Sequence, residues 1–594
     1  MNELKNKALK APPLGITRFE TVLSGGYYYV DKTPFIKKVL FDDKSQALLI
    51  TRPRRFGKTL SMASFFNFVK INPENPDDCA YQEKLFAGTK ILEEKECCNE
   101  LMGKYPVIFL SFKDVSGDSY AMTCGMLAAE IASCAQKHEY LLKSPRLSQN
   151  DKDAYAVISN KQLLNKASDL SDLGRSLRTL TDLLYKHYGR QVIVLIDEYD
   201  VPLAHSFTKG YYPEMVDLTR VVLSSVLKDN DYLKKAVITG CLRISRESIF
   251  TGLNNVVVNT VANDVGDLAE CMGFTKDETL AMLNYYDLSE QATAVKEWYD
   301  GYRIGDREIF CTWDVINFCT QALSERNNGK EVSAPQSFWI NSSSNEIIYE
   351  FMQHLDEQEA SRMQTLLDGG EIDFELAENF NYNDITLYHR ADDFWTLLLF
   401  TGYLTKVKAA VVGNKLICTV RIPNKEVRSA FEDSIFAFYR KDQVAISSSD
   451  EIVDAILQGN ANEVSRLIAL KLKKYVSVRD SATRAPQENF YHGFLNGIFS
   501  ANNKSLNSFH SNAEAGDGYA DIVFSNASNS IGVVIEVKAC SDGKNLSKLS
   551  KDALAQIDAK EYCEVFDQGL KKIYCYGIAF CHKKCYVQCD VREL

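Results

Sequence analysis

The chain has 594 residues, too many for one hydrophobic core, and its length predicts roughly two to four domains. Hydrophobic residues at 45% and charged residues at 25% are ordinary for a globular protein, and the net charge of −11 excludes a wholly basic, nucleic-acid-coating protein while leaving room for a local basic cleft. Sixteen cysteines without an N-terminal apolar segment predict reduced thiols and a cytoplasmic location. No apolar run is long enough to cross a bilayer, so we expect no membrane partner.

The first informative stretch is an apolar run at 47–51, a turn ending in Gly-Lys-Thr, and an apolar run of helical spacing at 60–69. A strand, a tight turn and a helix in this order are the setting of a P-loop, whose helix N-terminus attracts phosphate. Lys58 would reach the β- and γ-phosphates of ATP, and the Thr59 hydroxyl would bind Mg²⁺. The pattern prefers Gly at its first position, where this chain has Arg52. The predicted nucleotide-binding residues of this loop are Arg52, Pro53, Arg54, Arg55, Phe56, Gly57, Lys58 and Thr59.

A second apolar run, at 192–196, ends in two acids and is typical of a buried parallel strand. Open α/β sheets bind ligands at the carboxyl ends of their strands. We therefore expect Asp197 to hold the Mg²⁺ shell and Glu198 to polarise the attacking water. Either motif alone fits a buried strand or a solvated acidic turn, but the two in this order predict a nucleotide site.

A third short apolar run, at 236–240, predicts another strand of the same sheet. A polar residue at its end would lie beside the γ-phosphate, and Thr239 is the candidate sensor. Arg243 or Arg246 could bring positive charge to the transition state, and a surface salt bridge is an equally good interpretation of either arginine.

Several uncommon strings resemble the predicted AAA-ATPase-like family over residues 10–440. They are Arg52-Pro-Arg-Arg-Phe-Gly-Lys-Thr59, Asp197-Glu-Tyr-Asp200, Ser248-Ile-Phe-Thr-Gly-Leu-Asn-Asn255, Trp298-Tyr-Asp-Gly-Tyr302, Phe338-Trp-Ile-Asn-Ser342, Thr401-Gly-Tyr-Leu-Thr405 and Ile422-Pro-Asn-Lys-Glu426. In that family an arginine opens the P-loop, as Arg52 does here. Cys311-Thr-Trp-Asp314 departs from the Asn-Pro-Trp-Ser-like turn of the family. The resemblance implies a P-loop core at 1–262 followed by a helical lid or middle region at 263–445.

Near the C-terminus, apolar runs at 519–524 and 531–539 flank a polar turn and predict a β-hairpin. Asp521 starts the first strand and Glu536 lies near the end of the second, so antiparallel pairing brings the two carboxylates together, while Lys538 shares a face with Glu536. Two buried carboxylates are costly unless a cation lies between them, and hard oxygen ligands select Mg²⁺, with Mn²⁺ as a substitute. A salt-bridged hairpin without a metal is the alternative.

The Asp…Glu-x-Lys hairpin resembles the PD-(D/E)XK nuclease superfamily over 480–594, although Ala520 replaces the proline of the motif. The resemblance implies an α/β, restriction-endonuclease-like fold within a domain at 446–594. It further implies a first-helix acid at Glu488, a motif glutamine at Gln556, and backbone phosphate contacts from Lys560 and Tyr562.

The sequence therefore predicts an α/β protein with a P-loop NTPase parallel sheet and a nuclease domain, which hydrolyses ATP and cuts nucleic acid with Mg²⁺ under ATP control. DNA is favoured over RNA, and a homo-oligomer is compatible. An ATP-switched nucleic-acid-binding or signalling module with an inactive nuclease-like domain is the alternative function, and a nucleotide sensor that oligomerises and acts on a protein is a third.

Overall fold

The computed structural model divides the chain into two compact units, which are Met1–Trp339 with Asp373–Glu426 (unit 1) and Ile340–Ile372 with Val427–Leu594 (unit 2). Unit 1 thus includes most of the predicted middle region, and the predicted boundaries at 262 and 445 stay predictions. The structure describes residues 9–166, 170–242, 255–339, 357–377, 391–432, 451–475, 488–500, 506–515, 518–528, 530–540, 545–566, 570–581 and 584–593.

The centre of unit 1 is a parallel five-stranded sheet in the order β2-β3-β4-β1-β5. Its strands are β1 (Ala47–Thr51), β2 (Val107–Ser111), β3 (Val192–Asp197), β4 (Leu233–Gly240) and β5 (Val256–Asn259). Helices cover both faces of a parallel sheet, so both faces of each strand are buried. This is why the strands have continuous apolar sequences. The strands predicted at 47–51, 192–196 and 236–240 are confirmed. β4 lies between β1 and β3. Its carboxyl end therefore stands between the P-loop, which follows β1, and the acids at the end of β3.

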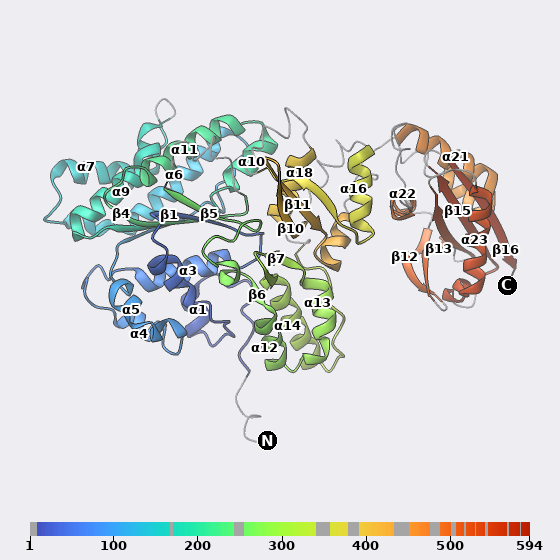
Figure 1. Ribbon diagram of the computed structural model, residues 1–594, viewed down its shortest axis with the longest axis horizontal. Coiled ribbons are helices and arrows are strands. Elements are labelled where there is room, and N and C mark those ends of the chain that lie inside the picture. The colour runs from blue at the N-terminus through green and yellow to red at the C-terminus, as the bar shows by residue number, and fades with distance from the viewer. Residues whose placement is uncertain are drawn as a thin grey trace, which may run out of the picture. The chain divides into compact units, whose positions relative to one another are not determined.

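Helices cover the two faces of this sheet, with α6, α9 and α11 above it and α1, α3, α4 and α5 below it in Figure 1. Two of the longer helices end at glycines in the left-handed conformation, α9 at Gly189 and α10 at Gly210. The helices are α1 (Phe19–Ser24), α2 (Pro34–Ile36), α3 (Lys58–Val69), α4 (Ala80–Leu85), α5 (Lys95–Leu101), α6 (Tyr120–Gln136), α7 (Gln149–Ile158), α8 (Lys161–Leu164), α9 (Ser171–Tyr188), α10 (Val201–Lys209) and α11 (Tyr212–Leu227).

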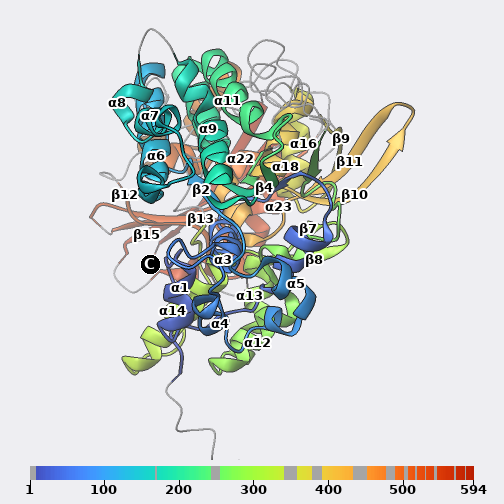
Figure 2. The ribbon, with the colours of Figure 1, turned by 90° about the vertical axis from the view of Figure 1, so that its left-hand side faces the viewer.

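The second half of unit 1 combines helices with two small three-stranded sheets, so the middle region is not helical alone. One sheet has the order β6-β8-β7, with β6 (Phe274–Thr275), β7 (Tyr302–Ile304) and β8 (Arg307–Phe310), and packs with α12 (Lys276–Tyr285), α13 (Ala292–Tyr299) and α14 (Thr312–Asn327). The other has the order β10-β11-β9, with β9 (Ile372–Glu375), β10 (Thr405–Val412) and β11 (Lys415–Arg421), near α18 (Ala391–Thr401). The β10–β11 hairpin extends as a long arm in Figure 2.

Unit 2 has a five-stranded sheet in the order β12-β13-β14-β15-β16, antiparallel except for the parallel β14–β15 pair, which α23 connects. Alternate residues of β14 face opposite sides, and Val533, Ile535 and Val537 enter one core while Val534 enters another. The elements are α16 (Glu357–Leu367), α21 (Ala461–Tyr475), α22 (Glu488–Ser500), β12 (Leu506–Ala515), β13 (Gly518–Asn526), β14 (Ile531–Ala539), α23 (Leu546–Ala559), β15 (Lys572–Cys581) and β16 (Lys584–Glu593).

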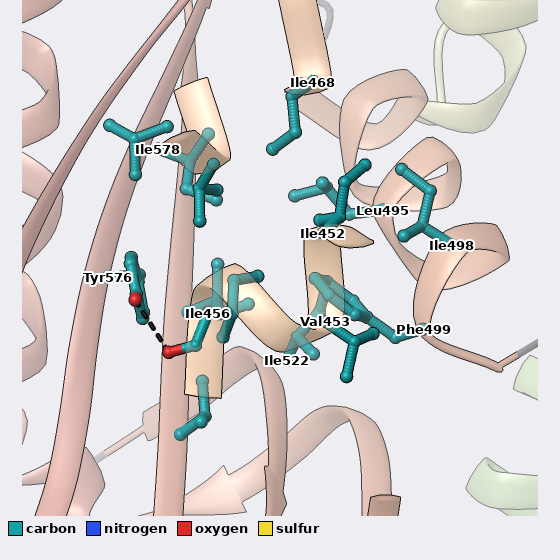
Figure 3. Packing of buried hydrophobic residues seen from close by; sticks show 14 of the residues in the cluster. Ile452, Val453, Ile456, Ile468, Leu495, Ile498, Phe499, Ile522, Tyr576 and Ile578 are labelled. Carbon is teal, nitrogen blue, oxygen red and sulfur yellow. Dashed lines mark hydrogen bonds between the residues drawn. The ribbon is translucent and has the colours of Figure 1, made fainter. Parts of the chain in front are cut away.

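The larger core of unit 2 joins the sheet to α21, α22 and the helical residues 451–457. Figure 3 shows Ile452, Val453 and Ile456 packed beside Phe499 and Tyr576, whose hydroxyl donates to the Ile456 carbonyl over 2.8 Å. This core fixes α22 against the sheet that carries the hairpin.

None of the helices within the described ranges has the length and apolar character needed to cross a membrane. The structure pairs none of the sixteen cysteines in a disulfide, and their reduced state stays a prediction.

Candidate functional site

The P-loop runs from the end of β1 at Thr51 to the start of α3 at Lys58. Gly57 has a φ of +81°, which glycine adopts without steric cost, and Arg55 has a φ of +70°, which is uncommon for a side-chain-bearing residue. The tight turn directs the free N–H groups of the first turn of α3 toward the end of the sheet, where an anion is favoured.

Lys58 is a deeply buried cation at the end of this loop. Its side chain is buried, and Nζ donates to the carbonyls of Arg52 (3.1 Å) and Pro53 (3.0 Å) and lies 3.7 Å from Oε1 of Glu198. Burial alone would lower the pKa of the Lys58 ammonium, but Cys241 and the surrounding carboxylates outweigh burial and raise it. The ammonium is therefore charged and held at the loop.

Asp197, at the end of β3, accepts hydrogen bonds from two threonine hydroxyls. Thr59 Oγ1 donates to its Oδ2 over 2.7 Å and Thr239 Oγ1 to its Oδ1 over 2.6 Å. Burial raises the pKa of Asp197, and the two threonine hydrogen bonds work against that rise. A fully buried carboxylate beside a hydroxyl is a donor set that fits Mg²⁺, so Thr59 and Asp197 are the residues that would hold the ion. Thr239 reaches Asp197 from β4, where the strand order puts it.

Two more acids complete the strand end. Glu198 has a φ of +57° and a side chain that is 20% exposed, so it stands where solvent can reach it. Asp200 is buried, and its Oδ2 accepts the N–H groups of Cys241 and Leu242, both over 2.9 Å. Burial, and then Glu198, raise the pKa of Asp200 to about 6. Sequence reasoning assigned Asp200 no role, although it stands in the quoted Asp-Glu-Tyr-Asp string.

The outer side of the P-loop is held by residues far along the chain. The Arg55 carbonyl accepts the Thr312 hydroxyl over 2.8 Å, and the Phe56 carbonyl accepts the Gly273 N–H over 2.8 Å. The Trp339 indole N–H donates to the Arg54 carbonyl over 3.3 Å. These contacts fix three consecutive peptides of the loop from outside the parallel sheet.

Further contacts extend this enclosure. The Arg55 guanidinium lies 4.3 Å from the Trp313 ring centroid, and Phe56 meets Tyr302 edge-on at 5.0 Å. Trp339 is itself anchored, because its main-chain N–H donates to Glu426 Oε1 over 2.7 Å. Four strings that sequence analysis quoted only for resemblance thus converge on one loop, namely those containing Tyr302, Trp339, Gly402 and Glu426.

The predicted nucleotide-binding residues do not all present side chains to a ligand. The Arg52 guanidinium is buried and donates to Asn259 Oδ1 (2.7 Å) and to the Leu268 carbonyl (2.9 Å). Its side chain therefore holds the loop against β5 and the segment at Leu268, and any contact of Arg52 with a nucleotide would come from its main chain. Arg243 and Arg246 lie outside the described residues.

The second site is the β13–β14 hairpin of unit 2, where the predicted antiparallel strands are confirmed. Ile522 pairs with Ile535, so Asp521 and Glu536 stand at the next position along the ladder. Asp521 Oδ2 accepts the Val537 N–H over 2.7 Å, which brings its carboxylate to the Glu536–Val537 peptide. Lys538 Nζ lies 3.1 Å from Oε1 of the buried Glu536, as expected for residues on one face.

The electrostatics of this hairpin favour a cation. Burial raises the pKa of Asp521, and His492, the Val537 N–H and Lys538 work against the rise. The two carboxylates, one buried and one mostly buried, are oxygen ligands that fit Mg²⁺ or Mn²⁺, and the Lys538 ammonium beside them offsets part of their charge. Among the described side chains no three His, Cys, Asp or Glu gather to hold a metal. The predicted third acid, Glu488, is the first residue of α22.

A polar network beside the hairpin was missed by sequence reasoning, which left His492 unassigned. His492 Nε2 lies 2.8 Å from the Asp521 carbonyl oxygen and 3.1 Å from Ser511 Oγ, and Asn496 Nδ2 donates to that Ser511 oxygen over 2.6 Å. His492 and Asn496 are polar residues four positions apart, on one side of a helix that is apolar over much of its length, which was the available signal. The network attaches α22 to the start of β13.

Gln556 lies on the helix where it was expected, whereas its neighbour Tyr562 differs from the expectation. Gln556 lies on α23, and its Nε2 donates to the Tyr562 hydroxyl over 3.3 Å. The Tyr562 side chain is buried, so it cannot meet a nucleic-acid backbone as predicted, whereas Lys560 is exposed. The buried ring supports the sheet instead.

Two family models match this chain, one over each of the two regions just described. Residues 13–250 match the family model described as predicted AAA-ATPase, and residues 486–589 match that of the PD-(D/E)XK nuclease superfamily. Proteins of these groups generally use a nucleotide and a divalent metal, respectively. An uncharacterised protein encoded in the vnfD 5' region of Azotobacter chroococcum mcd 1 is 22% identical over 493 residues, or 82% of each chain.

Proposed function

We propose that this chain, with its AAA-ATPase-like and PD-(D/E)XK domains, is an ATP-dependent nuclease that cuts nucleic-acid phosphodiesters under ATP control. The observation that carries the proposal is the presence of two acidic–basic groups in one chain, Lys58 paired with Glu198 beside the Thr59–Asp197 hydrogen bond, and Lys538 paired with Glu536. DNA is favoured over RNA, and mobile-element defence or DNA processing is inferred by analogy with this domain pairing.

In the ATPase unit, entering phosphate oxygens would replace the Arg52 and Pro53 carbonyls as partners of Lys58. Thr59 and Asp197 would hold Mg²⁺, which supplies charge neutralisation to the phosphates when bound. Glu198, partly exposed beside Lys58, would orient the attacking water. Thr239, bonded to Asp197, would transmit the state of the γ-phosphate to β4.

In the nuclease unit, Asp521 and Glu536 would hold the divalent ion, which lowers the pKa of a bound water and polarises the phosphodiester. Lys538 Nζ, 3.1 Å from Glu536, would position that water or neutralise the negative charge that develops on the phosphate. His492 would keep the Asp521 segment in place through its main-chain carbonyl.

The ATPase half is tested with Lys58→Ala, using Lys161→Ala on the exposed start of α8 as the matched control. Loss of the charge that meets the phosphates should lower ATP turnover by on the order of 100-fold or more. Purified protein is assayed for phosphate release, and turnover by Lys58→Ala equal to that of the control would reject the P-loop assignment.

The nuclease half is tested with Glu536→Gln, with the exposed Glu564→Gln of the same unit as its control. We expect Glu536→Gln to lower Mg²⁺- or Mn²⁺-dependent cutting by on the order of 100-fold. Separately, electron paramagnetic resonance should detect Mn²⁺ bound to the wild type. Equal cutting by both variants would mean that a contaminating nuclease is being measured.

ATP control and the alternative function are separated by one matrix of assays. Wild type and Lys58→Ala are given DNA and RNA, with and without ATP, and their masses in solution are measured in parallel. ATP-stimulated cutting that Lys58→Ala loses supports the proposal. Metal and nucleic-acid binding with no cutting under any condition would favour the ATP-switched binding module, and an ATP-dependent change of mass would reveal a homo-oligomer.

A further inference from the structure

A cavity of about 500 Å³ lies in unit 1 at the end of α3 that is remote from the P-loop. It is bounded by the last turn of α3, by α4, by the start of the edge strand β2 and by the end of α6. With 12 residues in α3, the cavity is about 18 Å from the P-loop, so it is separate from the nucleotide site. Its volume is within the usual range of small-molecule pockets.

Aromatic rings form much of its lining. Phe66 and Phe109 have centroids 5.5 Å apart, and Tyr81 and Tyr140 contribute two more rings. Phe66 and Phe109 are only half-buried, so part of each ring is open, and Lys70 Nζ lies over the Phe66 ring at 5.0 Å and over the Tyr81 ring at 4.3 Å. Tyr81 is 42% exposed, which leaves the cavity accessible from solvent. Flat ring surfaces favour a flat aromatic ligand.

The charge of the lining is positive. Lys70 and Lys137 line the cavity, and none of the described residues that line it is acidic. Lys70 is oriented by Asn67 Oδ1 (2.7 Å) and by the Tyr81 hydroxyl (3.2 Å), with Glu20 at 3.9 Å outside the lining. Lys137 is exposed.

His138 adds no charge near neutral pH. Burial, and then Lys137, lower the pKa of His138 to about 4, and its Nδ1 lies 2.8 Å from the Tyr140 hydroxyl. The imidazole is therefore a neutral polar group next to the rings. The excess positive charge of the cavity comes from the two lysines.

We propose that this cavity is a binding site for a small planar aromatic molecule that carries an anionic group. The rings would stack on the aromatic part and the lysines would pair with the anion. Aromatic carboxylates and nucleoside 5'-monophosphates share this chemistry. The site is independent of the proposed nuclease activity.

The test uses the full chain and the fluorescence of 8-anilinonaphthalene-1-sulfonate, with saturating inorganic triphosphate and Mg²⁺, which carry no aromatic ring, present to block the P-loop. The matched probe is N-phenyl-1-naphthylamine, which has the same rings without the sulfonate. We expect the sulfonate to bind at least tenfold more tightly than the neutral probe. Equal affinity of the two probes would overturn the assignment of an anionic ligand.

Two variants locate the dye. Lys137→Glu reverses an exposed charge and Phe109→Ala removes one ring, with Lys161→Glu on α8 as the charge-matched control. Circular dichroism and ATP turnover establish that each variant is folded. Binding weakened at least fivefold in both variants and unchanged in the control supports the site, whereas wild-type affinity in both variants overturns it.

Displacement identifies the ligand type. Release of the dye by 2-naphthoate and not by adenosine 5'-monophosphate indicates an aromatic carboxylate site, and the reverse result indicates a nucleotide monophosphate site. Failure of both to release the dye would overturn the proposal.

Discussion

Replacing Asp200 with Asn tests the electrostatics beneath the P-loop. Asp200 is buried, and burial raises its pKa from the ordinary 3.8 to about 6. Because the folded pKa lies above the unfolded value, the folded state binds the proton more tightly. The stability that protonation contributes is complete below pH 3.8 and is lost as the pH rises through about 6.

The size of the effect follows from the two pKa values. A shift from 3.8 to about 6 corresponds to about 3 kcal/mol between the fully protonated and fully ionised limits. Between pH 5 and pH 7.5 the loss is about 1.4 kcal/mol, because part of it has already occurred by pH 5. The Asn side-chain oxygen can still accept the Cys241 and Leu242 N–H groups. Its NH₂ takes the place of Asp200 Oδ1, which has no hydrogen-bond partner. The buried, unpaired NH₂ lowers the free energy of unfolding by about 1–3 kcal/mol at every pH. The pH dependence, rather than the absolute stability, is therefore diagnostic.

Urea unfolding followed by tryptophan fluorescence measures this quantity for unit 1. The wild type should lose about 1.4 kcal/mol more than Asp200→Asn between pH 5 and pH 7.5, while the exposed Asp231→Asn control should follow the wild type. Parallel pH curves for wild type and Asp200→Asn would refute the burial argument. All four tryptophans belong to unit 1, namely Trp298, Trp313, Trp339 and Trp395.

Two glycine substitutions test close packing in the two units. Gly240→Ala would put a Cβ 2.5 Å from Asp200 Oδ1, and we expect it to destabilise unit 1 by about 1–3 kcal/mol in the same urea assay; an unchanged midpoint would show that the strand end can relax. Gly577→Ala would bring a Cβ against the Ser550 carbonyl of α23, so amide hydrogen exchange of α23 and β15 should become faster, and unaltered protection would contradict the packing described there.

The parts of the fold that could be predicted are those with a local signal. Continuous apolar runs located β1, β3 and β4, and two apolar runs on either side of a polar turn located the β13–β14 hairpin, because a strand buried on both faces is apolar along its length. The Lys58–Asp197 and Glu536–Lys538 groups followed from motif spacing. Their geometry in the structure agrees with that spacing, while the roles assigned to them stay proposals.

The rest depended on distant contacts. Nothing near Arg52 in the sequence indicates that Asn259 and Leu268 accept its guanidinium, and nothing near Trp339 indicates that it reaches the Arg54 carbonyl. The burial of Tyr562 likewise depends on the packing of its unit rather than on a pattern. Such long-range partners leave no periodicity for a single sequence to reveal.

The enclosure of the P-loop has a consequence for how the chain is made. The loop is translated early, but Trp339 and Glu426, which brace it from outside, leave the ribosome only after hundreds of further residues. A nascent chain that has just exposed 13–250 therefore holds the phosphate-binding turn without its braces. The proposed triphosphate-binding loop should therefore be fully braced only late in synthesis. This happens shortly before the strands of unit 2 that carry Asp521 and Glu536 emerge.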